Sequence, residues 1–215
     1  MQFEIPANGS TKWISTLVYR VHESAENIIT FVMRDIDQRK REELALKERA
    51  EIDGLTRLYN AATTRSKIRA LPSQPHHAEE KQIFILFDLD NFKKINDTFG
   101  HSVGDQVLVD MANILKKHFR STDIVGRLGR DEFVAMVCDV KSELYYIENI
   151  VDSLRADLVQ TYTEGDISIV VSASMGIAVS PQDGTTFKEL YKNADAALYE
   201  VKKQGKNGYK RWSEQ

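Results

Sequence analysis

Residues 83–90 read IFILFDLD, an apolar run that ends on Asp88 and Asp90. Such a run predicts a strand that is buried on both faces of a sheet. Buried strands seldom end on two acids unless a cation lies beside them, because an isolated carboxylate is costly to remove from water. The run therefore predicts a buried strand with a charged site at its end.

Asp88 and Asp90 are two positions apart, so in a strand both carboxylates are expected on the same side. Oxygen ligands at the end of a strand suit Mg²⁺, which proteins often share with a substrate phosphate. The alternative interpretation is that one acid caps the following helix and the other is solvated.

A second pair of acids, Asp131 and Glu132, lies in the segment GRDEF at residues 129–133. The apolar runs on the two sides of this segment predict a hairpin. Consecutive acids at a turn are ordinarily solvated, but these open an apolar strand, so one should point over the sheet towards Asp88. If the two strand ends are neighbours, three or four carboxylates converge, as phosphoryl transfer with two metal ions requires.

Asn96 and Asp105 lie nine positions apart across a glycine-rich turn, with Lys93 nearby. An amide and a carboxylate can read the edge of a guanine, since the carboxylate accepts from the ring N–H and the amino group. The alternative is that Asp105 caps a helix over residues 105–119.

The rest of the chain after residue 53 alternates between helical and strand-like patterns. Apolar residues recur at helical spacing over residues 107–115, 147–158 and 190–201. Short apolar runs predict strands at residues 124–128 and 133–137 and a strand at 167–171 that continues through 177–179, and a short strand is expected after the last helix. Such interleaving predicts an α/β (α+β) fold with a mixed sheet of about five strands flanked by helices.

The chain divides at about residue 53. Upstream, β-prone runs at residues 13–21 and 28–33 predict a hairpin, which is marginal in water without a partner surface. Between residues 35 and 53, twelve of nineteen residues are charged and none is Gly or Pro, which predicts a helix. It is either a solvated linker or a signalling helix that pairs in a dimer, and its sparse apolar positions favour the linker.

The composition excludes several classes of protein. The 215 residues carry 29 Lys+Arg and 32 Asp+Glu, a net charge of −3, which argues against non-specific nucleic-acid binding. Cys138 is the only cysteine, so an intramolecular disulfide is excluded. The chain has no apolar run long enough to span a bilayer and no signal peptide at its start, so we expect a cytoplasmic piece with no membrane segment, although a longer parent chain could carry an anchor.

Several motifs in register resemble the GGDEF domain of diguanylate cyclases. They are DGLT at 53–56, FDLDNFKKIND at 87–97, GHSVGD at 100–105, GRDEF at 129–133, SMG at 174–176 and ADAALY at 194–199. The resemblance covers residues 53 to about 212. Upstream, FVMRDID at 31–37 resembles the end of a PAS sensor domain. The implied organisation is a truncated PAS end at 1–36, a signalling helix at 37–52 and a GGDEF domain at 53–215.

The resemblance implies a mainly antiparallel sheet, similar to nucleotidyl cyclase catalytic domains, and the condensation of two GTP molecules into cyclic di-GMP by a homodimer. It implies Mg²⁺ or Mn²⁺ held by Asp88, the Leu89 carbonyl and Asp131. Catalytic roles would fall to Asp131, Glu132 and Lys93. Substrate would be bound by Asn96, Asp105, Gly129, Arg130, Lys202 and Lys206. Arg120 and Asp123 match the RxxD motif at which the family binds its product as an inhibitor.

The sequence departs from the family pattern at the nucleotide positions. Arg130 replaces the second glycine of the namesake turn, Arg57 replaces a glycine, Ala61 replaces an arginine and Lys206 replaces an arginine. A type II′ turn needs glycine only at its first central position, so Gly129 should preserve the hairpin while Arg130 alters the pocket. Two hypotheses stay open: an active cyclase, or a non-catalytic receptor for cyclic di-GMP or GTP.

Overall fold

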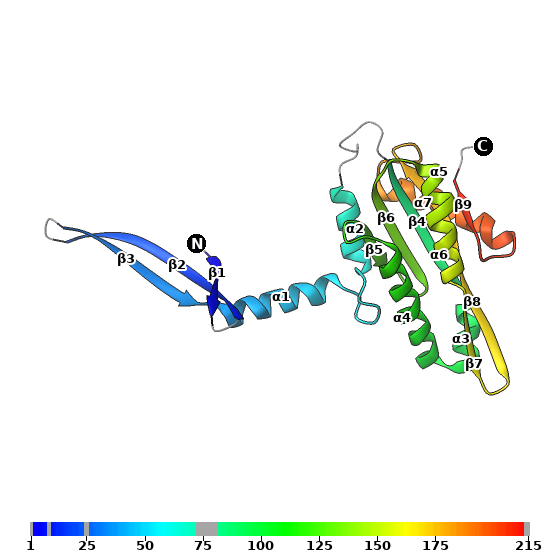
Figure 1. Ribbon diagram of the computed structural model, residues 1–215, viewed down its shortest axis with the longest axis horizontal. Helices are drawn as coiled ribbons and strands as arrows, with labels where there is room; N and C mark the ends of the chain where they lie inside the picture. The colour runs from blue at the N-terminus through cyan, green and yellow to red at the C-terminus, as the bar shows by residue number, and fades with distance from the viewer. Residues whose placement is uncertain (1, 8–9, 24–25, 72–80, 213–215) are drawn as a thin grey trace. The chain divides into compact units, whose positions relative to one another are not determined.

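The computed structural model describes residues 2–7, 10–23, 26–71 and 81–212. They form two compact units that divide between Ala50 and Glu51, and Figure 1 shows the helices and strands of each.

The N-terminal unit is a three-stranded antiparallel sheet in the order β1-β2-β3, followed by a helix. Its elements are β1 (Gln2–Ala7), β2 (Ser10–Glu23), β3 (Glu26–Asp35) and α1 (Asp37–Glu51). The predicted hairpin is confirmed as β2 and β3, with longer strands than the apolar runs indicated. The sequence did not predict β1, and the helix predicted from the charged segment is confirmed as α1.

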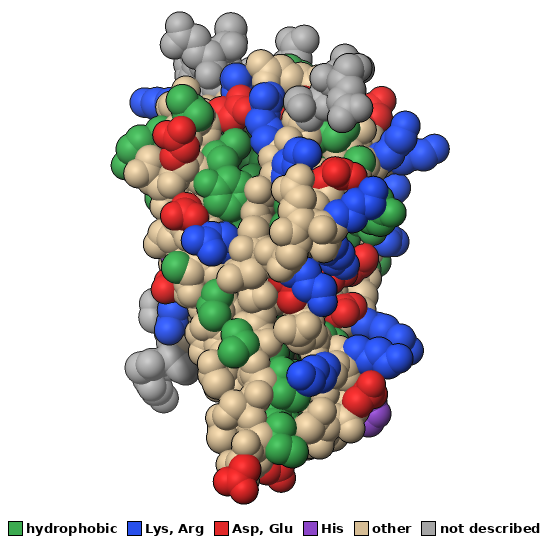
Figure 2. Space-filling model, turned by 90° about the vertical axis from the view of Figure 1, so that its right-hand side faces the viewer, with side chains coloured by type: hydrophobic (Ala, Val, Ile, Leu, Met, Phe, Trp, Pro, Cys, Tyr) green, Lys and Arg blue, Asp and Glu red, His purple; other side chains and the backbone are tan. Residues whose placement is uncertain are grey.

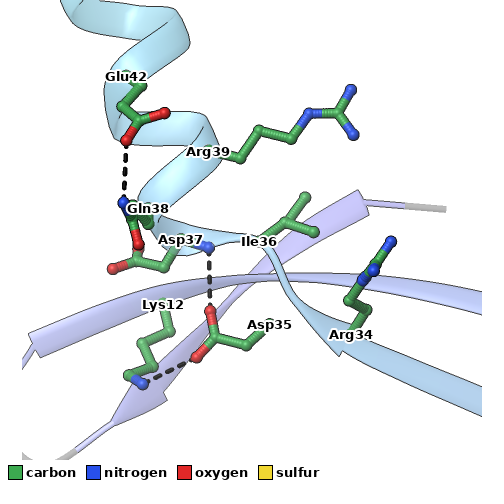
Figure 3. Close-up of a pocket in the computed structure, with 8 residues that line it drawn as sticks. All are labelled: Lys12, Arg34, Asp35, Ile36, Asp37, Gln38, Arg39 and Glu42. Carbon is green, nitrogen blue, oxygen red and sulfur yellow. Dashed lines mark hydrogen bonds and ion pairs between the residues drawn. The ribbon is translucent and has the colours of Figure 1, made fainter.

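Asp35 stabilises the junction between β3 and α1 (Figure 3). Its carboxylate accepts hydrogen bonds from Lys12 Nζ at 2.9 Å and from the backbone N of Asp37 at 3.0 Å. The backbone N of Ile36 donates to the Trp13 carbonyl at 3.0 Å. The carboxylate therefore satisfies a backbone donor at the start of the helix while its ion pair ties that start to β2.

The C-terminal unit is built on a six-stranded sheet in the order β5-β6-β4-β8-β7, with β9 paired to β8. The strands are β4 (Lys81–Asp90), β5 (Ile124–Arg127), β6 (Glu132–Val140), β7 (Gln160–Glu164), β8 (Ile167–Ser180) and β9 (Tyr209–Arg211). Every pair is antiparallel except β8 with β9. The predicted α+β fold with a mixed, mainly antiparallel sheet is confirmed. The short strand predicted after the last helix is β9, and β7 is the strand that the sequence did not predict.

Helices cover both faces of this sheet (Figure 1). They are α2 (Ala61–Ala70), α3 (Phe92–Phe99), α4 (His101–His118), α5 (Glu143–Tyr145), the π-helix η1 (Tyr146–Val151), α6 (Asp152–Asp157) and α7 (Phe187–Lys203). Ile83, Ile85 and Phe87 of β4 pack with α3, α4, η1 and α6, whereas Phe84 and Leu86 pack with α2 and α7. The central strand is thus buried on both faces, as the sequence predicted.

Alternation along β4 determines where its terminal acids point. Asp88 and Asp90 continue the row of Phe84 and Leu86, so both carboxylates leave the strand on the side of α7. This side also carries the lysines at the end of α7, so a cationic helix end lies beside the two acids.

The surface of the molecule mixes both signs of charge. On the face shown in Figure 2, Lys and Arg side chains stand next to Asp and Glu side chains. This matches the near balance of 29 basic and 32 acidic residues. Within the described ranges, no helix has the length and apolar character that crossing a membrane requires.

Gly176 of β8 lets α7 pack directly on the sheet. A Cβ at this position would lie 1.9 Å from the Ala194 carbonyl oxygen and 2.7 Å from the Leu198 backbone N. Both are helix backbone atoms, which cannot move aside singly as the end of a side chain could. The close approach therefore requires glycine.

We expect Gly176→Ala to lower the free energy of unfolding by about 2–3 kcal/mol, because α7 must shift off the sheet. Gly54→Ala is the matched control, since a Cβ at Gly54 meets nothing within 4 Å, and it should change stability by less than about 0.5 kcal/mol. Urea denaturation measures both. Equal stability of the two variants would contradict the packing described.

Candidate functional site

The two acidic strand ends are neighbours. Asp88 of β4 lies directly opposite Glu132 of β6 in the antiparallel register. The backbone N of Leu89 donates to the Asp131 carbonyl at 3.2 Å, one residue beyond the last paired position of β4 and β6. The strand ends are therefore neighbours, which was the condition that the sequence analysis set for the acids to converge.

Asp88, Asp131 and Glu132, here called the acid cluster, repel one another, and Lys202 opposes this repulsion. Lys202 Nζ of α7 lies 2.7 Å from Asp88 Oδ2. Burial raises the pKa of Asp88 despite Lys202, and the charges of Asp131 and Asp90 add to the rise. Burial likewise raises the pKa of Glu132, and the charges of neighbouring acids, first Asp88, add to it. A site where carboxylates destabilise one another's ionised form stabilises an added cation.

The acid cluster fits a divalent ion that is shared with a substrate. Within the described part of the chain, no three His, Cys, Asp or Glu side chains stand close enough to form a metal site by themselves. Asp88 and Asp131 offer hard oxygen ligands at one strand end, and the rest of a Mg²⁺ shell would have to come from phosphate and water. The residues therefore suit an ion that arrives with a nucleotide.

A cavity of about 590 Å³ opens beside the acid cluster. Among its lining residues are Lys93, Asn96, Asp105, Arg130 and Asp131. The structure thus brings together five predicted site residues that span 39 positions of the sequence. Gly129 and Glu132 are not among the lining residues, and Lys202 and Lys206 lie on the side of α7.

Glycine also sets the position of Asn96 in the cavity wall. A Cβ at Gly104 would lie 2.0 Å from Asn96 Oδ1, so the amide occupies the space that a side chain would fill. The helix α4 begins at His101, with Gly100 as its N-cap. The alternative that Asp105 caps this helix is therefore wrong, because its carboxylate lies one turn inside the helix and lines the cavity.

The loop between β5 and β6 is wider than the predicted type II′ turn. The Leu128 backbone N donates to the Glu132 carbonyl at 2.9 Å, which leaves residues 129–131 in the loop. Gly129 is not among the described residues with positive φ, so the prediction of a II′ turn is wrong. Arg130 likewise adopts an ordinary backbone conformation, which explains why a side chain is tolerated there.

Arg127 holds this loop and was not predicted as a site residue. Its guanidinium donates to the carbonyls of Gly129 at 2.9 Å and Arg130 at 2.8 Å, and its Nη1 lies 3.2 Å from Asp53 Oδ1. Burial acts to raise the pKa of Asp53, but hydrogen bonds from Thr56 and the charge of Arg127 outweigh it and lower the pKa. The available signal was a single arginine at the end of an otherwise apolar run.

The DGLT turn also accounts for one departure from the family pattern. Arg57, which follows it, has a φ of 58°, in the left-handed region that favours glycine. The glycine that the family carries at this position therefore suits the turn, and Arg57 retains the turn in a conformation that costs a side chain about 1–2 kcal/mol.

Two lysines stand on the α7 side of the acids. Lys202 pairs with Asp88, as described, and Lys206 Nζ lies 3.3 Å from Asn91 Oδ1. Lys206 follows the helix in a turn and has a φ of 66°. Both cations are therefore held at the end of β4, where a phosphate bound to the acid cluster would lie.

Arg120 and Asp123 line a separate cavity of about 530 Å³, with Cys138, Tyr145 and Tyr146 among its other lining residues. Asp123 is only 8% exposed. Its carboxylate accepts hydrogen bonds from the backbone N of Arg120 at 2.8 Å and of Cys138 at 3.3 Å. The Asp123 side chain thus stabilises the backbone through these two hydrogen bonds, whereas the Arg120 side chain is exposed.

Comparisons with known proteins agree with the fold. A sequence model described as "Diguanylate cyclase, GGDEF domain" matches residues 50–208. The bifunctional diguanylate cyclase/cyclic di-GMP phosphodiesterase MucR of Pseudomonas aeruginosa is 36% identical over 157 residues, covering 73% of this chain and 23% of MucR. Diguanylate cyclase DgcM of Escherichia coli K12 is 31% identical over 204 residues, covering 94% of this chain and 48% of DgcM. The chain spans less than half of either relative.

Among solved structures, the isolated GGDEF domain of TpbB (YfiN) from Pseudomonas aeruginosa matches with a TM-score of 0.68 at 30% identity. The match covers 75% of this chain and 94% of that structure. Residues 50–208, which the sequence model matches, contain the acid cluster, the residues that line the 590 Å³ cavity and the end of α7. The chain belongs to the GGDEF family of diguanylate cyclase domains.

Proposed function

We propose that this chain condenses two molecules of GTP into cyclic di-GMP. The observation that carries the proposal is that Asp131, which follows the strand-end pair of Asp88 and Glu132, lines the same cavity as Asn96 and Asp105. An amide and a carboxylate in one cavity can pair with the edge of a guanine, and acids at a strand end suit a metal-bound triphosphate.

In this proposal each domain holds one GTP, and two domains face each other as a homodimer. The 3′-hydroxyl oxygen of one GTP attacks the α-phosphorus of the other, and pyrophosphate leaves; the second, reciprocal attack closes the ring and releases a second pyrophosphate. A bound Mg²⁺ or Mn²⁺ would neutralise phosphate charge and lower the pKa of the attacking hydroxyl.

The residues of the chain have distinct parts in this scheme. Asp88, the Leu89 carbonyl and Asp131 would hold the ion, and Glu132, with its raised pKa, lies opposite Asp88 where it can take the hydroxyl proton. The side chains of Lys93, Lys202 and Lys206 would bind the triphosphate. Such a reaction belongs where GTP is available, in the cytoplasm.

The N-terminal unit is proposed to be the input to this domain. Its strands β2 and β3 and the helix α1 fit the end of a PAS sensor that continues into a signalling helix, with Asp35 fixing the step between them. Such a helix would control how two domains meet.

The test is to incubate the purified chain with GTP and Mg²⁺ and to identify products by mass spectrometry. Cyclic di-GMP and two equivalents of pyrophosphate are expected, and both should disappear with EDTA or in the Asp131→Asn variant. A chain that binds GTP and dimerises without forming cyclic di-GMP would contradict the proposal.

A second candidate is a receptor that binds cyclic di-GMP or GTP without turnover. Arg130 favours it, since this side chain lines the cavity where the family has only a glycine. A receptor would hold nucleotide at the cavity or at Arg120 and produce no pyrophosphate.

Gly104→Ala should impair guanine recognition without destabilising the fold. The new Cβ would displace the Asn96 amide, while alanine is the better helix former by up to about 1 kcal/mol. We expect discrimination between GTP and ATP, measured by calorimetry, to fall tenfold or more. Ser102→Ala on the same helix is the control. Equal discrimination in the two variants would mean that Asn96 does not recognise guanine.

Arg130→Gly should raise turnover at constant Mg²⁺. Removing the side chain enlarges the cavity, whereas the residue 130 carbonyl still accepts from Arg127, so stability should stay within about 1 kcal/mol. Better placement of the α-phosphate is the physical reason for the gain. Identical turnover would mean that Arg130 is harmless; two inactive proteins that both bind GTP would place the defect at Ala61 or Lys206, or in dimer formation.

Arg120→Ala should weaken cyclic di-GMP binding about tenfold, because one charge-assisted contact is lost while the exposed side chain holds nothing else in place. Asp123→Ala should instead lower stability by about 1–3 kcal/mol, since two backbone donors lose their acceptor. Calorimetry and urea denaturation measure the two effects, with Lys117→Ala as the control. Unchanged affinity in Arg120→Ala would exclude this cavity as the product site.

A further inference from the structure

Asp90 is a buried carboxylate that the proposed chemistry does not use. Its side chain is 3% exposed at the end of β4. Ser172 Oγ donates to its Oδ2 at 2.8 Å, the Asn207 backbone N donates to Oδ2 at 3.0 Å, and Ser174 Oγ donates to Oδ1 at 2.8 Å and to Oδ2 at 3.1 Å. Such a charge is retained inside a protein only where donors replace its lost hydration.

Asp90 takes no direct part in the proposed site. Its two oxygens accept from three donors, the Ser172 and Ser174 hydroxyls and the Asn207 backbone N, and they share the single Ser174 proton. Asp90 also does not line the 590 Å³ cavity. Its partners instead tie the end of β4 to β8 and to the turn that follows α7.

That turn, residues 204–208, has an unfavourable backbone conformation. Lys206 has a φ of 66° and Asn207 a φ of 47°, in the left-handed region that lysine seldom adopts and asparagine tolerates better. Two hydrogen bonds stabilise this conformation: Lys206 N donates to the Val201 carbonyl at 3.1 Å, and Asn207 N donates to Asp90. The first belongs to the helix end, and the second ties the turn to the end of β4. The Gly208 carbonyl also ties the end of the turn to β8, since it accepts from the Met175 backbone N at 2.9 Å.

The turn determines where the two α7-side lysines stand. Lys202 lies just before it and reaches Asp88, two residues from Asp90 on the same side of β4. Lys206 lies within it and reaches Asn91, the residue after Asp90. Release of Asn207 from Asp90 would free Lys206 first, because Lys202 is also held by the helix.

We propose that Asp90 is a positioning residue for the triphosphate of GTP. It holds the 204–208 turn against the sheet so that the Lys206 ammonium stands beside the acid cluster before the nucleotide binds. The inference rests on the proposed GTP site, and it adds a residue that acts through Lys206 rather than by touching substrate. Pre-organisation of this kind lowers the ordering cost of binding.

Asp90→Asn tests the inference because it keeps the size of the side chain and replaces an acceptor oxygen with a donor NH₂ group. Binding of the α,β-methylene analogue of GTP to the full chain with Mg²⁺ is measured by calorimetry. We expect the affinity to fall tenfold or more. In a Lys206→Met background the same substitution should cost less than about threefold, because the lysine through which it acts is gone.

Asp183→Asn is the matched control for loss of a buried carboxylate. Asp183 is 6% exposed and accepts a hydrogen bond from the Val179 backbone N at 2.7 Å, at the other end of β8. It should destabilise the fold while leaving affinity for the analogue unchanged. If Asp90→Asn does not fold, Ser174→Ala, which removes one of the three donors to Asp90, takes its place in the same cycle.

The outcomes separate this inference from the proposed function. If the parent chain does not bind the analogue, the proposed GTP site fails and the inference fails with it. If the parent binds and Asp90→Asn binds equally well, only the inference is overturned. A tenfold loss that persists unchanged in the Lys206→Met background would also overturn it, because Asp90 would then act on the fold as a whole.

Discussion

The repulsion among carboxylates at the ends of β4 and β6 is the constraint on which the rest of this structure depends. Asp88 and Glu132 face each other across one register position, and burial raises the pKa of both. The ladder fixes the strand ends, so these acids cannot separate without breaking the sheet. Positive charge at this point therefore stabilises the acids. Lys202 supplies it from within the chain, and a cation that arrives with a phosphate would supply it under the proposed function.

The position of α7 brings the positive charge of Lys202 to the acids. Gly176 allows the helix backbone to touch β8, which sets the helix close enough for Lys202 to reach Asp88. On the other side of the acids, Arg127 holds the loop at residues 129–131 and connects it to Asp53. The backbone of this loop accommodates a side chain at Arg130. This departure from the family pattern therefore changes a residue that lines the cavity and leaves the backbone that carries Asp131 in place.

The sequence predicted the parts of the fold whose signals are local. The apolar run of β4 and the acids at its end are features of a few consecutive residues, and so were found directly. The strand β7, QTYTE, is polar and has no periodic signal, so the sequence did not predict it. The turn at Gly129 was predicted wrongly because its sequence fits a II′ turn, whereas Arg127 holds a wider loop from outside it.

Site residues divide in the same way. Asn96, Asp105 and Asp131 were identified from sequence and meet in one cavity. The Asp123 carboxylate accepts from two backbone N–H groups, a role that no side-chain pattern reveals and that the sequence analysis did not include. The roles of Arg127 and Asp90 depend on partners that are distant in sequence: Asp53 for the arginine, and Ser172 and Asn207 for the carboxylate. Such roles follow only from the folded arrangement.

A crystal structure of the chain with Mg²⁺ and the α,β-methylene analogue of GTP tests the central claim most directly. The account predicts guanine between Asn96 and Asp105, phosphates beside Lys202 and Lys206, and a metal ion that bridges Asp88, Asp131 and the phosphates. A nucleotide bound only at the Arg120 cavity, or an acid cluster that binds no metal ion when the analogue is bound, would contradict it.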